Sequence, residues 1–140
     1  MAFLETLHVS YIESLKTQKP SLESCMTEHM KVSGIYWGIT AMSILNKENN
    51  MDPNTILTFL TACSNNDGGY GGNIGHDSHL LYTCHAILIY AVLDALDSID
   101  KEGVVKFVAS LQDDNDGSFS GDQYGKYYGK LIFEFYICIE

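Results

Sequence analysis

The sequence FLTAC at residues 59–63, followed by DGGY at residues 67–70, recurs as FVASL at residues 107–111, followed by DGSF at residues 116–119. The first parts begin 48 residues apart and the turns 49 residues apart, so the second copy carries one extra residue in its connection. A repeat of this length indicates supersecondary units that stack, because a single unit cannot bury its own apolar face.

Each repeat begins with a predicted helix that is apolar almost all round. These helices cover residues 35–45 and residues 80–93. In a globular protein, this composition predicts a helix that is buried on most sides.

Each repeat continues with a predicted helix that is apolar on one face only. These helices cover residues 53–63 and residues 101–111, and Asp52 and Asp100 precede them as N-cap residues. The economical arrangement is two concentric layers, in which amphipathic helices enclose the apolar ones.

The remaining segments predict a helix over residues 3–15, closed before Pro20, and a second helix over residues 22–31, capped by Ser21. The apolar stripe of the first helix should pack on a neighbour. The only candidate strand is the tail at residues 131–137, which is rich in aromatic and β-branched residues.

The composition indicates a globular, intracellular protein. The 140 residues are 46% hydrophobic, and 18 acidic residues against 8 basic ones give a net charge of −10. Nucleic acid is therefore an improbable partner. Residues 1–5 contain no basic residue and include Glu5, so no secretory signal is predicted, and the longest strongly apolar run, residues 86–93, is too short to span a bilayer.

The four cysteines are widely spaced, at Cys25, Cys63, Cys84 and Cys138. This spacing argues against a zinc finger and against a dense disulfide framework, and it fits a reducing, cytoplasmic compartment.

The glycine turns are expected to be structural joints, because a phosphate-binding loop would open a helix directly and supply a lysine. The sequence HDSH at residues 76–79 has two interpretations. In the first, it begins a zinc site that also uses Cys84 and His85 as ligands. In the second, which is favoured, either Asp77 or Ser78 caps the helix that begins near Leu80.

Residues 33–37, SGIYW, place a small hydroxyl and two large aromatics at the start of an apolar helix. They are either ordinary core or the wall of a cavity for an apolar ligand. No catalytic triad, Cys-His pair or paired carboxylate is visible, so no catalytic residue is assigned.

Three stretches resemble the β subunits of protein prenyltransferases: MKVSGIYWG at residues 30–38, IGHDSHLLYT at residues 74–83, and DGSFSGD at residues 116–122 with the preceding Leu111-Gln112. The first two are similar to the Rab geranylgeranyltransferase (type II) subfamily in particular. The resemblance covers residues 1–125, and residues 126–140 form a divergent apolar tail.

The resemblance implies an all-α fold, a partial α/α toroid that is open because the chain is truncated relative to the family. Inner-helix side chains are then expected to lie partly in water, namely Trp37, Met42, Leu81, Ile87 and Tyr90. Independent folding should suffer, since each large side chain left unburied forfeits roughly 1.5–3 kcal/mol.

The resemblance also implies chemistry. In the family, zinc turns an acceptor cysteine into a thiolate that attacks geranylgeranyl diphosphate. The implied partners are a prenyltransferase α subunit and a Rab GTPase with its Rab escort protein. Residues matching the isoprenoid pocket are Ser33, Tyr36, Trp37 and Cys84.

The family's zinc ligands lie beyond the end of this chain, so no metal ligand is assigned and the chain alone is expected to bind no zinc and to be inactive. The alternative is a non-catalytic product that keeps only contacts to the α subunit or to the isoprenoid.

Overall fold

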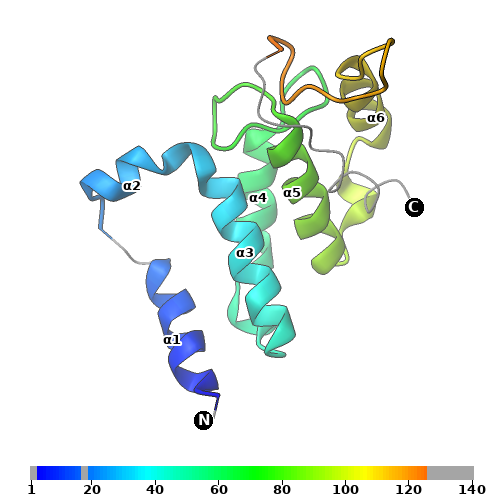
Figure 1. Cartoon of the computed structure of the whole chain (residues 1–140). Helices are drawn as coiled ribbons and strands as arrows, with labels where there is room; N and C mark the ends of the chain where they lie inside the picture. Colours follow the sequence, from blue (N-terminus) through cyan, green and yellow to red (C-terminus); the bar gives the residue numbers. More distant parts are fainter. Residues whose placement is uncertain (1–2, 17–18, 126–140) are drawn as a thin grey trace.

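The computed structural model describes residues 3–16 and 19–125, which fold into helices joined by glycine-rich loops (Figure 1). In chain order the elements are α1 (Glu5–Leu15), α2 (Leu22–Met26), the 3-10 helix η1 (Glu28–Met30), α3 (Lys31–Ile44), η2 (Glu48–Asn50), α4 (Pro53–Cys63), α5 (Leu80–Val92), η3 (Leu96–Ser98) and α6 (Lys101–Ser110). The predicted all-α fold is confirmed. The tail at residues 126–140, with its candidate strand, lies outside the described residues.

The repeat is visible in the backbone of the helix connections. Asn46 and Asp94, 48 residues apart, both adopt a left-handed conformation, with φ of 53° and 54°. Each is followed by a 3-10 helix, η2 or η3, and then by an aspartate that caps the next helix. The Asp52 carboxylate accepts from the amides of Asn54 and Thr55, and the Asp100 carboxylate accepts from the amide of Gly103. Both predicted N-caps are confirmed.

The two glycine turns also match each other. The Gly69 amide donates to the Asp67 carboxylate at 2.9 Å, and the Ser118 amide donates to the Asp116 carboxylate at 2.9 Å. The glycine between the pair has a positive φ in both turns, at Gly68 and Gly117. The turns therefore have the structural role that the sequence predicted, since only glycine adopts this conformation without strain.

The core forms where α3 and α5 lie side by side, with α4 behind them in Figure 1. Its fully buried side chains include Val32, Ile39, Met42, Leu60 and Ile89. Close packing of these side chains supplies most of the favourable free energy of a helical array.

The prediction that α3 and α5 are buried on nearly all sides is only partly right. On α3, Trp37 is 54% exposed and Ile44 is 76% exposed. Leu81 and Ile87 of α5 are half-buried, in agreement with the expectation that they lie partly in water. Met42 and Tyr90 were expected to be wet but are buried, because both face the core rather than the open side.

Two other helix predictions need correction. The expected helix over residues 22–31 is divided into α2 and η1, and α3 begins at Lys31, four residues earlier than predicted. The capping box at Ser21 is present and pairs with Ser24. The apolar face of α6 does not include Val105, which is exposed.

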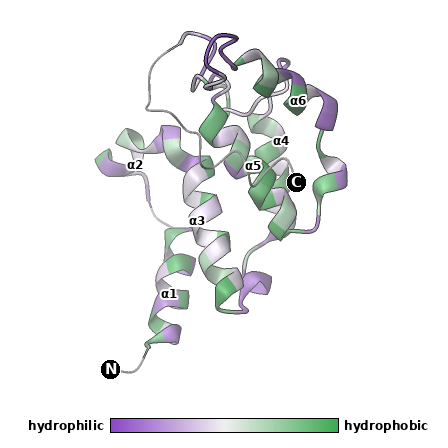
Figure 2. Cartoon of the chain, turned by 45° about the vertical axis from the view of Figure 1, so that its right-hand side comes forward, coloured by the Kyte–Doolittle hydropathy of each residue, from purple (hydrophilic) through white to green (hydrophobic). Residues whose placement is uncertain are grey.

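Most of the apolar stripe of α1 is exposed, so the prediction that it packs on a neighbour is only partly right. Leu7 and Tyr11 are each 64% exposed, and hydrophobic residues are visible along the helix in Figure 2. Within the described residues α1 packs chiefly on α3, through the half-buried Val9 and Ile12. The contact therefore uses Val9 and only one member of the predicted stripe, Ile12.

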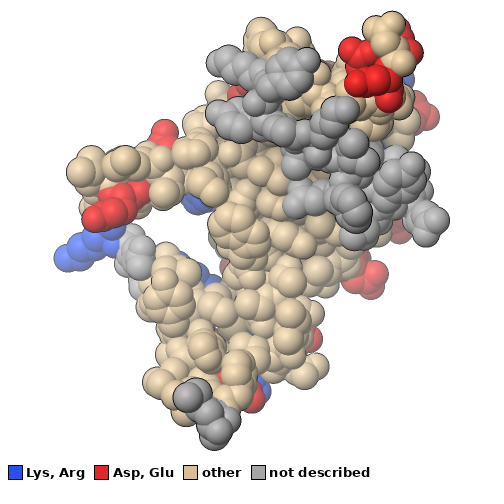
Figure 3. Space-filling model, viewed as in Figure 1, with Lys and Arg blue, Asp and Glu red and all other residues tan. Residues whose placement is uncertain are grey.

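Acidic side chains gather beyond the end of α6, where Asp113, Asp114 and Asp116 are exposed (Figure 3).

Among residues 3–16 and 19–125, no helix combines the length and the apolar character that crossing a bilayer requires.

Candidate functional site

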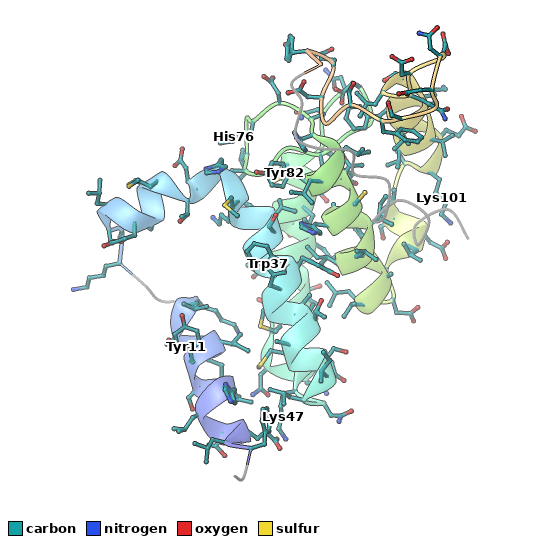
Figure 4. The ribbon with its side chains drawn as sticks, viewed as in Figure 1. Tyr11, Trp37, Lys47, His76, Tyr82 and Lys101 are labelled. Atoms are coloured by element: carbon teal, nitrogen blue, oxygen red, sulfur yellow. The ribbon has the colours of Figure 1, made fainter. Side chains whose placement is uncertain are left out.

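Three of the four predicted pocket residues meet on one side of the α3–α5 pair. Ser33, Tyr36 and Trp37 come from the first half of α3, and each of them contacts the same residue of α5, His85. We call Ser33, Tyr36, Trp37 and His85 the aromatic wall. Figure 4 shows Trp37 about midway along α3.

A hydrogen bond and two ring contacts join the side chains of the wall. The Ser33 hydroxyl oxygen lies 2.9 Å from Nδ1 of His85, and both side chains are buried. The Tyr36 ring stacks on the imidazole with centroids 4.4 Å apart and planes 16° apart. The Trp37 ring meets the imidazole edge-on at 6.3 Å and 68°.

The exposure of the wall residues to solvent increases along α3. Ser33 is fully buried, Tyr36 is half-buried and Trp37 is 54% exposed. A large aromatic face that remains in water beside a packed ring pair is suited to an apolar ligand, because covering it releases ordered water.

Cys84 lies elsewhere. It is 2% exposed and belongs to the hydrophobic core, one position before His85 on α5. Among the described residues, Cys25 is exposed, and Cys63 and Cys84 are buried. Burial raises the pKa of the Cys63 thiol to about 11, so this thiol stays protonated and unreactive near neutral pH.

Sequence reasoning missed the role of His85, which it considered only as a possible zinc ligand. A usable signal was present, since His85 is an ionisable side chain within an otherwise apolar helix. Buried polar groups are nearly always hydrogen-bonded, so such a residue demands a partner from another element.

The HDSH segment caps α5, but through a different residue than expected. His79 is the N-cap, and its Nδ1 accepts from the Leu81 amide at 3.1 Å. Ser78 is not free to cap, because its hydroxyl donates to Asp67 at 2.7 Å and accepts from Asn65 at 3.0 Å. The prediction of Asp77 or Ser78 as the cap is therefore wrong.

The described residues do not fit a zinc site. In residues 3–16 and 19–125, no three side chains of His, Cys, Asp or Glu come together as metal ligands. His76 instead points toward Glu28, with Nε2 and Oε1 4.0 Å apart.

Burial lowers the pKa of His79, an effect that the nearby Asp122 partly opposes. The unfolded chain therefore takes up this proton first, so the stability that neutral His79 contributes is complete above about pH 6.5 and is lost as the pH falls. A cap that accepts through Nδ1 also requires that nitrogen to be unprotonated.

We expect acidification from about pH 7.5 to about pH 5.5 to lower the thermal midpoint of the wild-type chain more than that of His79→Asn. Asparagine is a good N-cap and does not titrate. Circular dichroism melts at both pH values measure the difference. Equal acid sensitivity of the two chains would contradict the role assigned to His79.

Comparisons with known proteins agree with this geometry. Residues 3–130 match the family model described as the prenyltransferase alpha-alpha toroid domain. The chain is 34% identical over 136 residues to the geranylgeranyl transferase type-2 subunit beta of Saccharomyces cerevisiae, covering 95% of this chain and 42% of that protein.

Other relatives match over a shorter segment or at a lower identity. The geranylgeranyl transferase type-2 subunit beta 1 of Arabidopsis thaliana is 38% identical over 84 residues, covering 60% of this chain and 26% of that protein. The protein farnesyltransferase subunit beta of Schizosaccharomyces pombe is 23% identical over 129 residues, covering 90% of this chain and 33% of that protein. The chain thus spans less than half the length of these relatives.

The toroid match and the type-2 relatives confirm the resemblance that the sequence motifs carried. The chain belongs to the prenyltransferase alpha-alpha toroid family, and within it is similar to the β subunits of type-2 geranylgeranyl transferases.

Proposed function

We propose that this chain forms part of the isoprenoid-binding side of a type-2 geranylgeranyl transferase β subunit. The observation that carries the proposal is the aromatic wall, in which a buried Ser33–His85 pair supports a half-exposed Trp37. The reaction transfers a geranylgeranyl group from its diphosphate to a C-terminal cysteine of a Rab GTPase. The cysteine thiol gives its proton to solvent and reacts as a thiolate; the C1–sulfur bond forms, and diphosphate leaves with the electron pair of the broken C1–oxygen bond.

The chain's own contribution is to bind the hydrocarbon. Tyr36 and Trp37 present aromatic surface to isoprene units, and covering the exposed Trp37 removes apolar area from water. Ser33 is the small member of the wall, and we propose that its size leaves room for a long isoprenoid chain. We propose the same role for Cys84, which lies in the core one position before His85.

We propose zinc as the metal of the complete enzyme and cytoplasm as its location. Because the described residues do not fit a zinc site, no step is assigned to the metal here. We further propose that the 140-residue chain by itself binds the isoprenoid without transferring it.

The proposed partners are a prenyltransferase α subunit and a Rab GTPase carried by an escort protein. The exposed apolar side chains of α1 favour a second, non-catalytic function as a contact for the α subunit. Co-purification with the α subunit, lost when Leu7 and Tyr11 are both changed to serine, is the expected result for that function.

Anisotropy of a fluorescent geranylgeranyl diphosphate tests the main proposal. We expect the chain to bind it and Trp37→Ala to weaken binding about tenfold, since a large aromatic face is worth roughly 1.5–3 kcal/mol when fully covered. Val105→Ala, at an apolar position on α6 that is also more than half exposed, is the control and should bind as the wild type.

A chain that does not bind the probe, or a Trp37→Ala variant that binds unchanged, would contradict isoprenoid binding at the wall. A transfer assay with a Rab protein, its escort protein and zinc tests the second part. Transfer by the chain alone would overturn the proposal that it binds without turnover.

A further inference from the structure

His85 is the point at which α5 contacts all the side chains that α3 contributes to the wall. Ser33 and His85 lie 52 positions apart in sequence, so their hydrogen bond is a purely tertiary contact. His85 is 5% exposed and Ser33 is fully buried. The bond therefore sits in a region where competition from water is weak.

The imidazole orients two rings in two different ways. It lies flat against Tyr36, at 4.4 Å and 16°, and it meets Trp37 edge-on, at 6.3 Å and 68°. Stacked and edge-to-face arrangements are the two favoured geometries for aromatic pairs. One planar side chain thus determines the tilt of both aromatics.

Trp37 depends on this support more than the other wall residues do. It is 54% exposed, so much of its indole ring has water rather than protein beside it. A surface aromatic with few neighbours samples several rotamers. If the free protein already holds the ring in one rotamer, ligand binding loses less side-chain entropy and is therefore more favourable.

We infer that His85 is a positioning residue: its imidazole anchors Ser33 and clamps Tyr36, and through the edge contact it holds Trp37 in the orientation that receives the isoprenoid. The ring plane matters for the aromatics and the Nδ1 position matters for Ser33. The inference rests on the proposed function for the identity of the ligand, but the clamp itself is a property of the free chain.

The two roles of the imidazole can be separated by substitution in the full 140-residue chain. His85→Phe keeps a flat ring and removes the hydrogen-bonding nitrogen, whereas His85→Asn keeps a hydrogen-bonding group near Nδ1 and removes the ring. His85→Ala removes both. Phe107→Leu on α6, which lies on the far side of α5 from α3 in Figure 1, is a buried control of comparable size.

Trp37 is the single tryptophan of the chain, so its fluorescence reports on the wall alone. Acrylamide quenching of Trp37 without lipid should rise in His85→Asn and His85→Ala, and should stay at the wild-type value in His85→Phe and Phe107→Leu. Far-ultraviolet circular dichroism identifies the variants that remain folded, and only these are compared.

Affinity for the fluorescent geranylgeranyl diphosphate should follow the same order. We expect His85→Asn and His85→Ala to bind about tenfold more weakly, because they lose the aromatic pair and its interaction free energy. We expect His85→Phe, which keeps the ring, to bind within about threefold of the wild type. Rescue by the flat but non-polar phenylalanine is a result that a general loss of stability does not produce.

Unchanged Trp37 quenching in folded His85→Asn would overturn the inference. So would a Phe107→Leu variant that raises quenching as much as His85→Asn does. If the wild-type chain fails to bind the lipid, the proposed function is contradicted, while the quenching measurement still decides whether His85 clamps Trp37.

Discussion

Gly72→Ala is expected to lower the free energy of unfolding by about 3 kcal/mol, at the upper end of what overpacking costs. Gly72 lies in the loop between α4 and α5, where its carbonyl accepts from the Val32 amide at 3.0 Å. A β-carbon at this position would overlap the backbone carbonyl oxygen of His29 and would press on the Tyr82 ring at 2.7 Å.

The collision is severe because one of the two obstacles is backbone. A tyrosine ring turns aside, but the carbonyl of His29 belongs to η1, directly before α3. Relief therefore requires the loop and the beginning of α3 to separate, which breaks the hydrogen bond to Val32.

Urea unfolding followed by circular dichroism measures the change. Gly34→Ala is the matched control, since Gly34 is an exposed residue of α3 whose added β-carbon would meet nothing within 4 Å. Alanine there should gain up to about 1 kcal/mol from its better helix propensity. Equal stability of Gly72→Ala and the wild type would contradict the close approach of loop and helix.

Ile39→Ala is expected to lose about 3 kcal/mol, within the range of roughly 2–5 kcal/mol for emptying a buried isoleucine site. Ile39 is fully buried at the centre of α3, in the core shared with α5. Against a total stability of about 5–15 kcal/mol, this loss removes a large share of the free energy of unfolding of a marginal domain.

The same helix provides the control. Ile44 is 76% exposed, so Ile44→Ala should change stability by no more than about 0.5 kcal/mol. Paired denaturant titrations of the two variants compare the two sides of α3 with the same substitution. Equal losses would mean that the open side of α3 is covered in solution.

The features that sequence spacing predicted correctly are local. The caps at Ser21, Asp52 and Asp100 each join a side chain to an amide two or three residues away. The glycine turns at Gly68 and Gly117 are equally short-range. Such contacts depend on residue type and separation, both of which can be read directly from the chain.

The errors in the predicted site arise where two distant segments compete for one group. Ser78 has the right residue type and nearly the right position to cap α5, but Asp67 and Asn65 engage its hydroxyl first. His79, the less usual cap, is then the residue that remains at the helix start. The sequence around the start of α5 does not reveal that competition for the Ser78 hydroxyl.

The repeat at residues 59–70 and 107–119, the caps of α2, α4 and α6 and the family all follow from the sequence, because they depend on periodicity, motifs and short-range hydrogen bonds. The joining of Ser33, Tyr36 and Trp37 through His85 does not, because it requires α3 and α5 to pack first. Tertiary packing also decided which side of α3 stays wet, since burial is a property of neighbours supplied by the whole fold rather than of the residue itself.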